Sequence, residues 1–254
     1  MMKYGLIGEK LGHSYSKFIH ERLADYTYDL IPLRREELAP FMTARDFGAI
    51  NVTIPYKQEV IPFLDELDPL ARKIGAVNTV VNRNGKLYGY NTDFYGFEYM
   101  VQHNNIEVYG KKCLILGNGG TAQTAHAALN HLGASEILII SRKDTDSTQS
   151  YEKCYEHHND AEIIVNTTPL GMFPNIDAAP LDLIYFRHCE AVIDVIFNPL
   201  HTKLTLQAEE LGIKSVNGLE MLVAQAKQAI EHFLDTRLED SVIDTIYQEL
   251  LTNL

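Results

Sequence analysis

The chain has 254 residues, enough for one large domain or two modest domains that each bury a core. Its hydrophobic content of 46% is normal for a globular protein, and no apolar run approaches the ~18–20 residues of a membrane span, so we expect no membrane partner. The formal net charge of −12, with no basic stripe to offset it, argues against nucleic acid as a partner but leaves room for an anionic cofactor.

The three cysteines are Cys113, Cys154 and Cys189, and they form no CxxC motif and no even disulfide set. The N-terminal segment lacks the apolar core of a signal peptide. We therefore expect a cytoplasmic protein with reduced cysteines.

The first half of the chain alternates short β-like runs with amphipathic stretches. Strands are predicted at residues 4–8, 28–32 and 48–53, and helices near 16–24, 35–43 and 57–66. This alternation indicates a mainly parallel sheet with crossover helices. Two further runs, 77–82 and 87–91, flank Gly85 and predict a hairpin, after which residues 93–104 predict a connecting helix.

A second α/β pattern begins at Lys112. Strands are predicted at residues 113–116, 136–140, 162–166, 191–196 and 214–216, with a helix at 123–132 after the first of them. Residues 144–159 read as loop plus a short helix, and helices are predicted from 219 through 230 and at 239–251. The fold class is therefore α/β, with two α/β domains.

Three polar blocks lie within about forty residues of each other. They are Asn51-Val-Thr-Ile-Pro-Tyr-Lys57, Gly75-Ala-Val-Asn-Thr79 and Gly89-Tyr-Asn-Thr-Asp93. Their amides and hydroxyls suit a small polyhydroxylated ligand, while Lys57 and Asp93 supply a movable proton and a fixed charge. Two structural alternatives remain: Lys57 as a surface lysine at a helix start, and Asp93 as only the N-cap of the helix from Phe94.

A glycine-rich loop, Gly117-Asn-Gly-Gly-Thr-Ala122, follows the strand at 113–116 and opens a helix. In a dinucleotide site, Gly117 permits the tight turn and Gly119 lets the backbone approach the pyrophosphate at the helix N-terminus. The strand 137–140 then runs into Ser141-Arg142-Lys143, where NAD-binding units usually carry a carboxylate. An arginine there favours a 2′-phosphate, and hence NADP(H), although Arg142 and Lys143 could also be plain surface charges.

Together these blocks resemble the shikimate dehydrogenase family almost from end to end. The segment Gly8…His13-Ser-Tyr-Ser16…His20 is similar to the family's HSxSP…H block, and later matches are Asn166-Thr-Thr-Pro-Leu-Gly-Met172 and Asn217-Gly-Leu-Glu-Met-Leu-Val-Ala-Gln225. The resemblance implies an NADPH-dependent reductase of 3-dehydroshikimate, acting in aromatic amino-acid biosynthesis, with its substrate between two domains. We expect a substrate domain at residues 1–100 plus 221–254 and a Rossmann-like NADP domain at 101–220.

The resemblance also implies roles for individual residues. Lys57 and Asp93 fall on the catalytic pair, and Ser14 and Ser16 on the serines that bind the substrate carboxylate, although both serines could also cap a helix. The hydroxyl-binding positions fall on Asn51, Thr53, Asn78 and Gln225. The cofactor positions fall on Gly117, Asn118, Gly119, Gly120, Thr121, Ser141, Arg142, Lys143, Val195 and Gly218.

Some positions depart from the family pattern. Phe197 stands where the family typically has a substrate-contacting Tyr, and losing that hydroxyl removes a hydrogen bond worth roughly 0.5–1.5 kcal/mol. Lys17 and Glu21 replace a common Pro and Asn. A quinate- or NAD-using relative would prefer Thr at Ser16 and an acidic residue near Ser141, and a non-catalytic nucleotide-binding module would lack Lys57 or Asp93. No metal site is expected, because the histidines show no HxxxH or HExxH spacing. The chain is expected to be a monomer or a homodimer.

Overall fold

The computed structural model describes residues 3–12 and 14–253. The chain divides into two compact units: unit 1 comprises Met1–Gly96 and Leu222–Leu254, and unit 2 comprises Phe97–Met221. Among the described residues, no helix is both long enough and apolar enough to cross a membrane.

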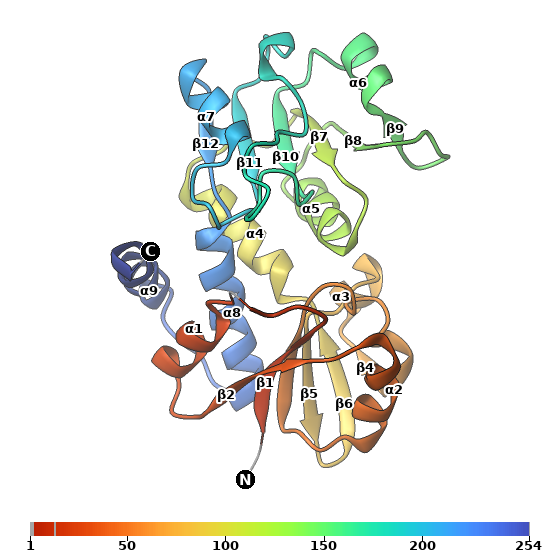
Figure 1. Cartoon of the computed structure of the whole chain (residues 1–254), viewed down its shortest axis with the longest axis vertical. Coiled ribbons are helices and arrows are strands. Elements are labelled where there is room, and N and C mark those ends of the chain that lie inside the picture. Colours follow the sequence, from red (N-terminus) through yellow and green to blue (C-terminus); the bar gives the residue numbers. More distant parts are fainter. Residues whose placement is uncertain (1–2, 13, 254) are drawn as a thin grey trace. The chain divides into compact units, whose positions relative to one another are not determined.

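Unit 1 is built on a six-stranded sheet with strand order β2-β1-β3-β5-β6-β4 (Figure 1). The strands are β1 (Tyr4–Gly8), β2 (Tyr28–Pro32), β3 (Ala49–Val52), β4 (Glu66–Leu67), β5 (Thr79–Arg83) and β6 (Lys86–Tyr90). The helices that lie wholly or partly in this unit are α1 (Ser16–Leu23), α2 (Arg35–Ala44), α3 (Pro69–Ile74), α4 (Thr92–His103), α8 (Leu219–Leu234) and α9 (Ser241–Asn253). Strand β1 pairs in parallel with β2 and β3, whereas β5 is antiparallel to both β3 and β6.

Adjacent residues of β1 point to opposite faces of this sheet, and each face carries its own core. Ile7 packs in a cluster with Leu38 and Met42 of α2, whereas Leu6 packs with Ala229 and Phe233 of α8 (Leu219–Leu234). Helix α8 thus brings the C-terminal part of the chain into the core formed by its first strand.

The predicted hairpin is confirmed, because β5 and β6 pair from Thr79–Tyr90 to Arg83–Lys86. Its two turn residues, Asn84 and Gly85, have φ of 54° and 86°. Positive φ at both central positions is the requirement of a type I′ turn, which Asn-Gly meets with little strain.

The predicted helix at residues 57–66 is wrong. This segment forms consecutive turns, a 3₁₀ helix at Ile61–Phe63 and the short strand β4. The carbonyl of Lys57 accepts a hydrogen bond from Val77 N, while Ile61 N donates to Gln58 O. A tertiary contact therefore takes the carbonyl that an α-helix would have bonded to Ile61.

Unit 2 contains a fully parallel six-stranded sheet with strand order β12-β11-β10-β7-β8-β9. Its strands are β7 (Lys112–Leu116), β8 (Glu136–Ser141), β9 (Gln149–Ser150), β10 (Ile163–Asn166), β11 (Ala191–Asp194) and β12 (Lys214–Val216). Its helices include α5 (Gly120–His131), α6 (Tyr151–His157) and α7 (Lys203–Glu210), with a 3₁₀ helix at Leu183–Tyr185.

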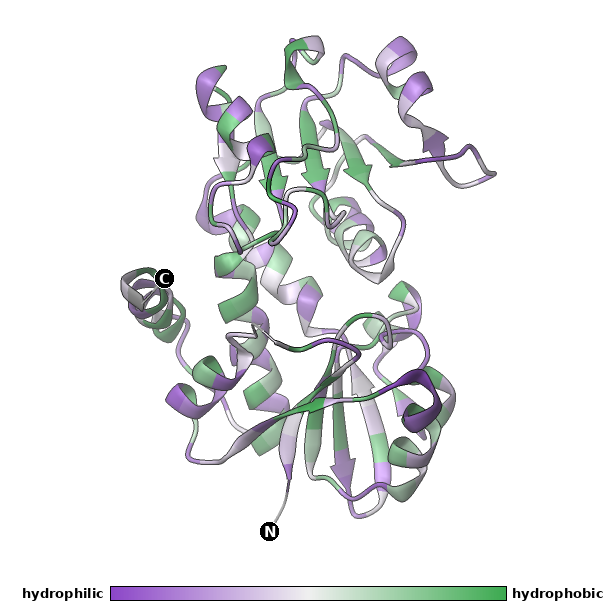
Figure 2. Cartoon of the chain, viewed as in Figure 1, coloured by the Kyte–Doolittle hydropathy of each residue, from purple (hydrophilic) through white to green (hydrophobic). Residues whose placement is uncertain are grey.

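The central strands of unit 2 are almost continuously apolar, as their green colour in Figure 2 shows. Leu114, Ile164 and Val192, one from each of β7, β10 and β11, are fully buried. Strands covered on both faces need such runs rather than alternation. This doubly wound parallel sheet confirms the expected Rossmann-like unit.

Candidate active site

The polar blocks of unit 1 meet at one edge of its sheet. Strand register places Asn51 of β3 opposite Thr79 of β5, and Thr79 opposite Tyr90 of β6. Residues that follow β3 and β6, or precede β5, therefore leave the sheet at the same edge. The same edge receives the carboxyl ends of the neighbouring parallel strands β1 and β3, and the chain leaves β1 towards β2 on one side and β3 towards β4 on the other. Such a switch point is where open α/β sheets bind ligands.

Asn51, Asn78 and Gln225 belong to one buried hydrogen-bond network. Asn51 Nδ2 donates to Asn78 O at 3.2 Å and to Thr79 Oγ1 at 3.1 Å. Asn78 Oδ1 accepts from Thr92 N at 2.7 Å, and Asn78 Nδ2 donates to Gln225 Oε1 at 3.4 Å. Gln225 comes from α8, so three of the predicted hydroxyl-binding side chains are in fact brought together from distant parts of the chain.

Lys57 and Asp93 form an ion pair beside this network. Lys57 Nζ donates to Asp93 Oδ2 at 2.6 Å, and the two side chains are 15% and 10% exposed. Lys57 lies in the turns that follow β3, and Asp93 lies in the first turn of α4. The pair is thus partly desolvated, which strengthens its attraction relative to a surface salt bridge.

Asp93 is not the N-cap residue of α4, the alternative role considered for it. Helix α4 begins at Thr92, and the side chain of Asn91 accepts a hydrogen bond from Phe94 N at 3.1 Å. Asn91 therefore occupies the capping position, and the Asp93 carboxylate faces Lys57 instead.

The two serines and Thr53 lie in the loops that leave β1 and β3. Ser14 Oγ accepts a hydrogen bond from Ser16 N at 3.2 Å in the turn before α1, but the N-cap residue of α1 is Tyr15, so neither serine is the N-cap. Ser16 is buried, while Ser14 and Thr53 are half-buried. No hydrogen bond described here joins these three side chains to the Lys57–Asp93 pair. His13, from the same motif, lies outside the described residues.

The glycine loop of unit 2 has the geometry of a phosphate-binding turn. Gly117 has φ of +103°, and a Cβ there would lie 2.9 Å from Thr167 Oγ1, so the fold itself demands glycine. Gly119, at the N-cap of α5, has open space where its Cβ would be. Asn118 and Gly119 are exposed, and Gly120 and Thr121 begin the helix. Open backbone at a helix N-terminus fits a pyrophosphate.

The carboxyl end of β8 presents positive charge. Ser141 Oγ donates to Lys143 O at 3.1 Å, which holds the turn, and the side chains of Arg142 and Lys143 are exposed. Strand β8 itself ends without a carboxylate. These residues fit a phosphorylated ribose better than a free 2′-hydroxyl.

Val195 and Gly218 are in direct backbone contact after β11 and β12. A Cβ on Gly218 would lie 2.0 Å from Val195 O, which no side chain can tolerate, and Gly218 N donates to Ile196 O at 2.9 Å. Phe197, two residues after Val195, is half-buried.

Sequence reasoning missed Asp194, which shapes this loop. Asp194 Oδ1 accepts from Asn166 Nδ2 at 3.0 Å and from Ile196 N at 3.1 Å, and Oδ2 accepts from Thr202 Oγ1 at 2.7 Å. Burial raises the pKa of Asp194 to about 6, although the three donors oppose that rise. The available signal was a lone carboxylate at the end of an apolar strand, eight residues before a helix-capping threonine.

Comparison with known proteins identifies the family. The family model described as the shikimate dehydrogenase substrate binding domain matches residues 6–80. A relative from Clostridium beijerinckii, named shikimate dehydrogenase (NADP(+)), is 37% identical over 259 residues, which cover 96% of each chain. A Bacillus cereus relative of the same name is 37% identical and covers 90% of this chain and 91% of its own.

Solved structures agree with the sequence relatives. Shikimate dehydrogenase 1 from Peptoclostridium difficile superposes with a TM-score of 0.92 at 35% identity, covering 98% of both chains. The Thermus thermophilus enzyme in complex with NADP(H) and shikimate gives a TM-score of 0.86 at 28% identity, covering 98% of this chain and 99% of that one. The family expected from the motifs is confirmed: this chain belongs to the shikimate dehydrogenase family.

Proposed function

We propose that Lys57 and Asp93 are the acid–base pair with which this chain reduces 3-dehydroshikimate to shikimate. As a member of its family, the chain is an NADP-dependent oxidoreductase that acts on a CH–OH group in the shikimate pathway of aromatic amino-acid biosynthesis. The observation that carries the catalytic assignment is the 2.6 Å contact between Lys57 Nζ and Asp93 Oδ2, set among neutral amides and hydroxyls.

The pair suits the charge that develops in the reaction. NADPH, when bound, supplies a hydride to the carbonyl carbon, and negative charge builds on the carbonyl oxygen. The Lys57 ammonium stabilises this charge and gives its proton to the oxygen, while Asp93 orients the ammonium. In the reverse direction, the Lys57 amine takes the proton back from the hydroxyl.

Substrate binding is assigned to the side chains around this pair. Asn51, Thr53, Asn78 and Gln225 are proposed to bind hydroxyl groups, and the hydrogen bonds among three of them hold a preorganised polar surface. Ser14 and Ser16 are proposed to bind the carboxylate, and Phe197 to line the site without a hydroxyl.

The residues of unit 2 are assigned to the cofactor. Gly117 to Thr121 would hold the pyrophosphate, Ser141 to Lys143 the 2′-phosphate, and Val195 and Gly218 the backbone wall beyond β11. The open space at Gly119 and the exposed cations after β8 support this assignment. We further propose a cytoplasmic setting, supported by three cysteines that are free thiols, with the chain acting as a monomer or homodimer.

Substrate and cofactor choice can be tested in a single assay. Absorbance at the nicotinamide band is followed with shikimate or quinate, each with NADP or NAD. The proposal expects the highest kcat/KM for shikimate with NADP. A higher value for quinate, or for NAD, would reassign the substrate or the cofactor while leaving the catalytic pair open to its own test.

Lys57→Ala should lower kcat by about 10²–10⁴, the usual range for a lost acid–base group, while KM changes much less. The reason is that Lys57 interacts with the oxygen mainly as charge develops. The measurement is steady-state kinetics under conditions where chemistry limits turnover.

Lys57→Met serves as the matched control for packing, because it retains the bulk of the side chain without its charge. It should be as inactive as Lys57→Ala. If either variant turns over within threefold of the wild-type kcat, Lys57 is not the proton donor.

A further inference from the structure

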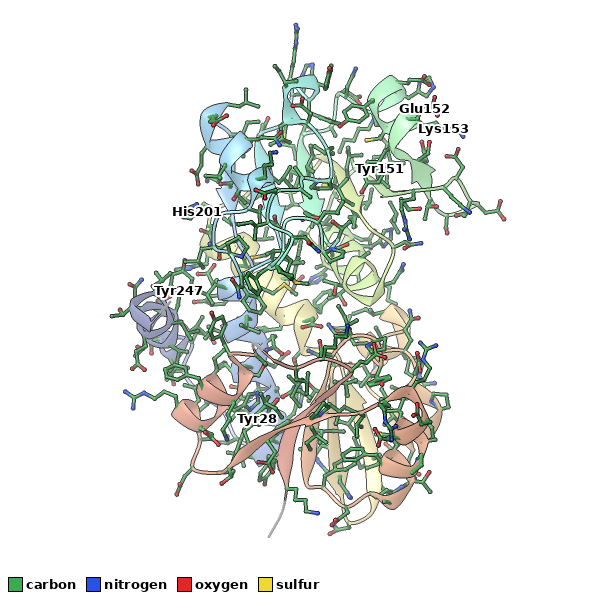
Figure 3. The ribbon with its side chains drawn as sticks, in the orientation of Figure 1. Tyr28, Tyr151, Glu152, Lys153, His201 and Tyr247 are labelled. Atoms are coloured by element: carbon green, nitrogen blue, oxygen red, sulfur yellow. The ribbon has the colours of Figure 1, made fainter. Side chains whose placement is uncertain are left out.

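Tyr28 forms a hydrogen bond with Asn51, one of the residues proposed to bind the substrate. Its hydroxyl donates to Asn51 Oδ1 at 2.7 Å, and the Tyr28 side chain is fully buried in unit 1, at the start of β2 (Figure 3). Tyr28 lies outside the sequence motifs, so the sequence did not indicate that it belongs to the site.

The partners of Asn51 fix the orientation of its amide group. The Asn78 carbonyl can only accept a hydrogen bond, so the atom facing it must be Nδ2. Both Nδ2 hydrogens are then used, one by Asn78 O and one by Thr79 Oγ1. Oδ1 receives the Tyr28 proton and retains one further lone pair.

The Tyr28 ring is itself held in place by aromatic neighbours. The His20 ring stacks on it with centroids 4.0 Å apart and planes 16° apart, and His20 Nδ1 lies 2.7 Å from the Tyr26 hydroxyl. Burial lowers the pKa of His20 to about 3 and raises the pKa of Tyr28 well above its usual value. The imidazole therefore stays neutral, and the Tyr28 hydroxyl keeps the proton that it donates.

We propose that Tyr28 is a positioning residue that holds Asn51 Oδ1 as the acceptor for a substrate hydroxyl. This inference rests on the proposed function, because it takes Asn51 as a substrate ligand. The inference adds that Asn51 binds a hydrogen-bond donor of the substrate, such as an alcohol O–H. Both hydrogens of its amide already bond to Asn78 and Thr79, so only Oδ1 can bind the substrate.

The test compares two identical substitutions in the same aromatic cluster. Tyr28→Phe retains the ring and its stack but removes the hydroxyl that faces Asn51. Tyr26→Phe removes the hydroxyl that faces His20. We expect Tyr28→Phe to raise the KM for shikimate by about three- to tenfold, the value of one hydrogen bond, with a smaller fall in kcat and an unchanged KM for NADP. We expect Tyr26→Phe to lower Tm while leaving the KM for shikimate within twofold of wild type.

Asn51→Ala separates this inference from the site assignment. It should raise the KM for shikimate, and adding Tyr28→Phe to it should change KM no further, because the hydroxyl then has no ligand to position. If Asn51→Ala leaves KM unchanged, the proposed role of Asn51 fails. If Asn51→Ala raises KM but Tyr28→Phe does not, or Tyr26→Phe raises it equally, the positioning role of Tyr28 is overturned while the site assignment stands.

Discussion

Asp194 is a buried carboxylate of unit 2 whose hydrogen-bond donors are all neutral. It is fully buried, and its hydrogen-bond partners are the side chains of Asn166 and Thr202 and the backbone of Ile196. A buried carboxylate with neutral partners favours its protonated form, which accounts for the rise of its pKa to about 6. The hydrogen bond from Ile196 N to Asp194 spans Val195. The protonation state of Asp194 therefore affects the loop that is proposed to bind the cofactor.

This raised pKa predicts a pH-dependent contribution to stability. The unfolded chain loses the Asp194 proton near pH 3.8, whereas the folded chain holds it to about pH 6. The group therefore contributes stability that is complete below pH 3.8 and is lost as pH rises through 6. Asp194→Asn removes the titration, so the wild type should gain stability over the variant, on the order of 2 kcal/mol, as pH falls from 7.5 to 4.5.

The measurement is the free energy of unfolding of both proteins at several pH values, so that other titrating groups cancel in the difference. A difference that stays constant between pH 4.5 and 7.5 would show that Asp194 has an ordinary pKa.

At the scale of single elements, the end of β8 determines which nicotinamide cofactor is expected. Its last residue, Ser141, forms a turn with Lys143, and the two cations Arg142 and Lys143 project from it. Arginine can bind a phosphate through two parallel hydrogen bonds, which a ribose hydroxyl cannot exploit. We therefore propose that the positive charge of this turn favours NADP over NAD.

Arg142→Ala should raise the KM for NADP by about tenfold and leave the KM for NAD almost unchanged, because only the 2′-phosphate is lost as a partner. Steady-state kinetics with both cofactors measure this. Arg187→Ala, which removes an exposed arginine elsewhere in unit 2, is the control and should change neither value. Equal losses for both cofactors in Arg142→Ala would mean that Arg142 does not read the 2′-phosphate.

Elements with strong local signals could be predicted from the sequence. The hairpin followed from the two β-like runs that flank Gly85, and the apolar strands of unit 2 followed from their continuous hydrophobicity. The helix at 57–66 could not be excluded, because the bond from Val77 N to the Lys57 carbonyl depends on a residue twenty positions away. Helix-like periodicity carries no information about such a contact.

The candidate site was predictable only in part, for a similar reason. The motifs identify Asn51, Lys57 and Asp93 because they stand in polar blocks, but Tyr28 and Asp194 stand in ordinary strand sequence. Their roles depend on which side chains the folded sheet places beside them. The roles assigned to the motif residues remain predictions for the kinetic tests above.

At the scale of the whole molecule, the two ends of the chain build one core. Phe233, near the end of α8, packs with Leu6 of β1 and Tyr28 of β2 and is 8% exposed. The next residue, Leu234, is 42% exposed. Phe233 and Leu234 are therefore expected to differ in how much each side chain contributes to the stability of unit 1.

Phe233→Ala should lower the free energy of unfolding by about 3–5 kcal/mol, because it leaves a cavity in the core of unit 1. Leu234→Ala, the control, should cost much less because its side chain is partly in water already. Denaturant unfolding followed by tyrosine fluorescence or circular dichroism measures both. Equal costs for the two variants would mean that α8 is not anchored through Phe233.

The division of unit 1 between Met1–Gly96 and Leu222–Leu254 also determines when each part of the molecule can fold during translation. Domains usually fold in the order in which they leave the ribosome. Here all of unit 2 has been synthesised by Met221, whereas the first strand must wait for Ala229 and Phe233 to complete its core. Synthesis of unit 2 is therefore complete before α8 supplies the residues that close the core around the first strand of unit 1.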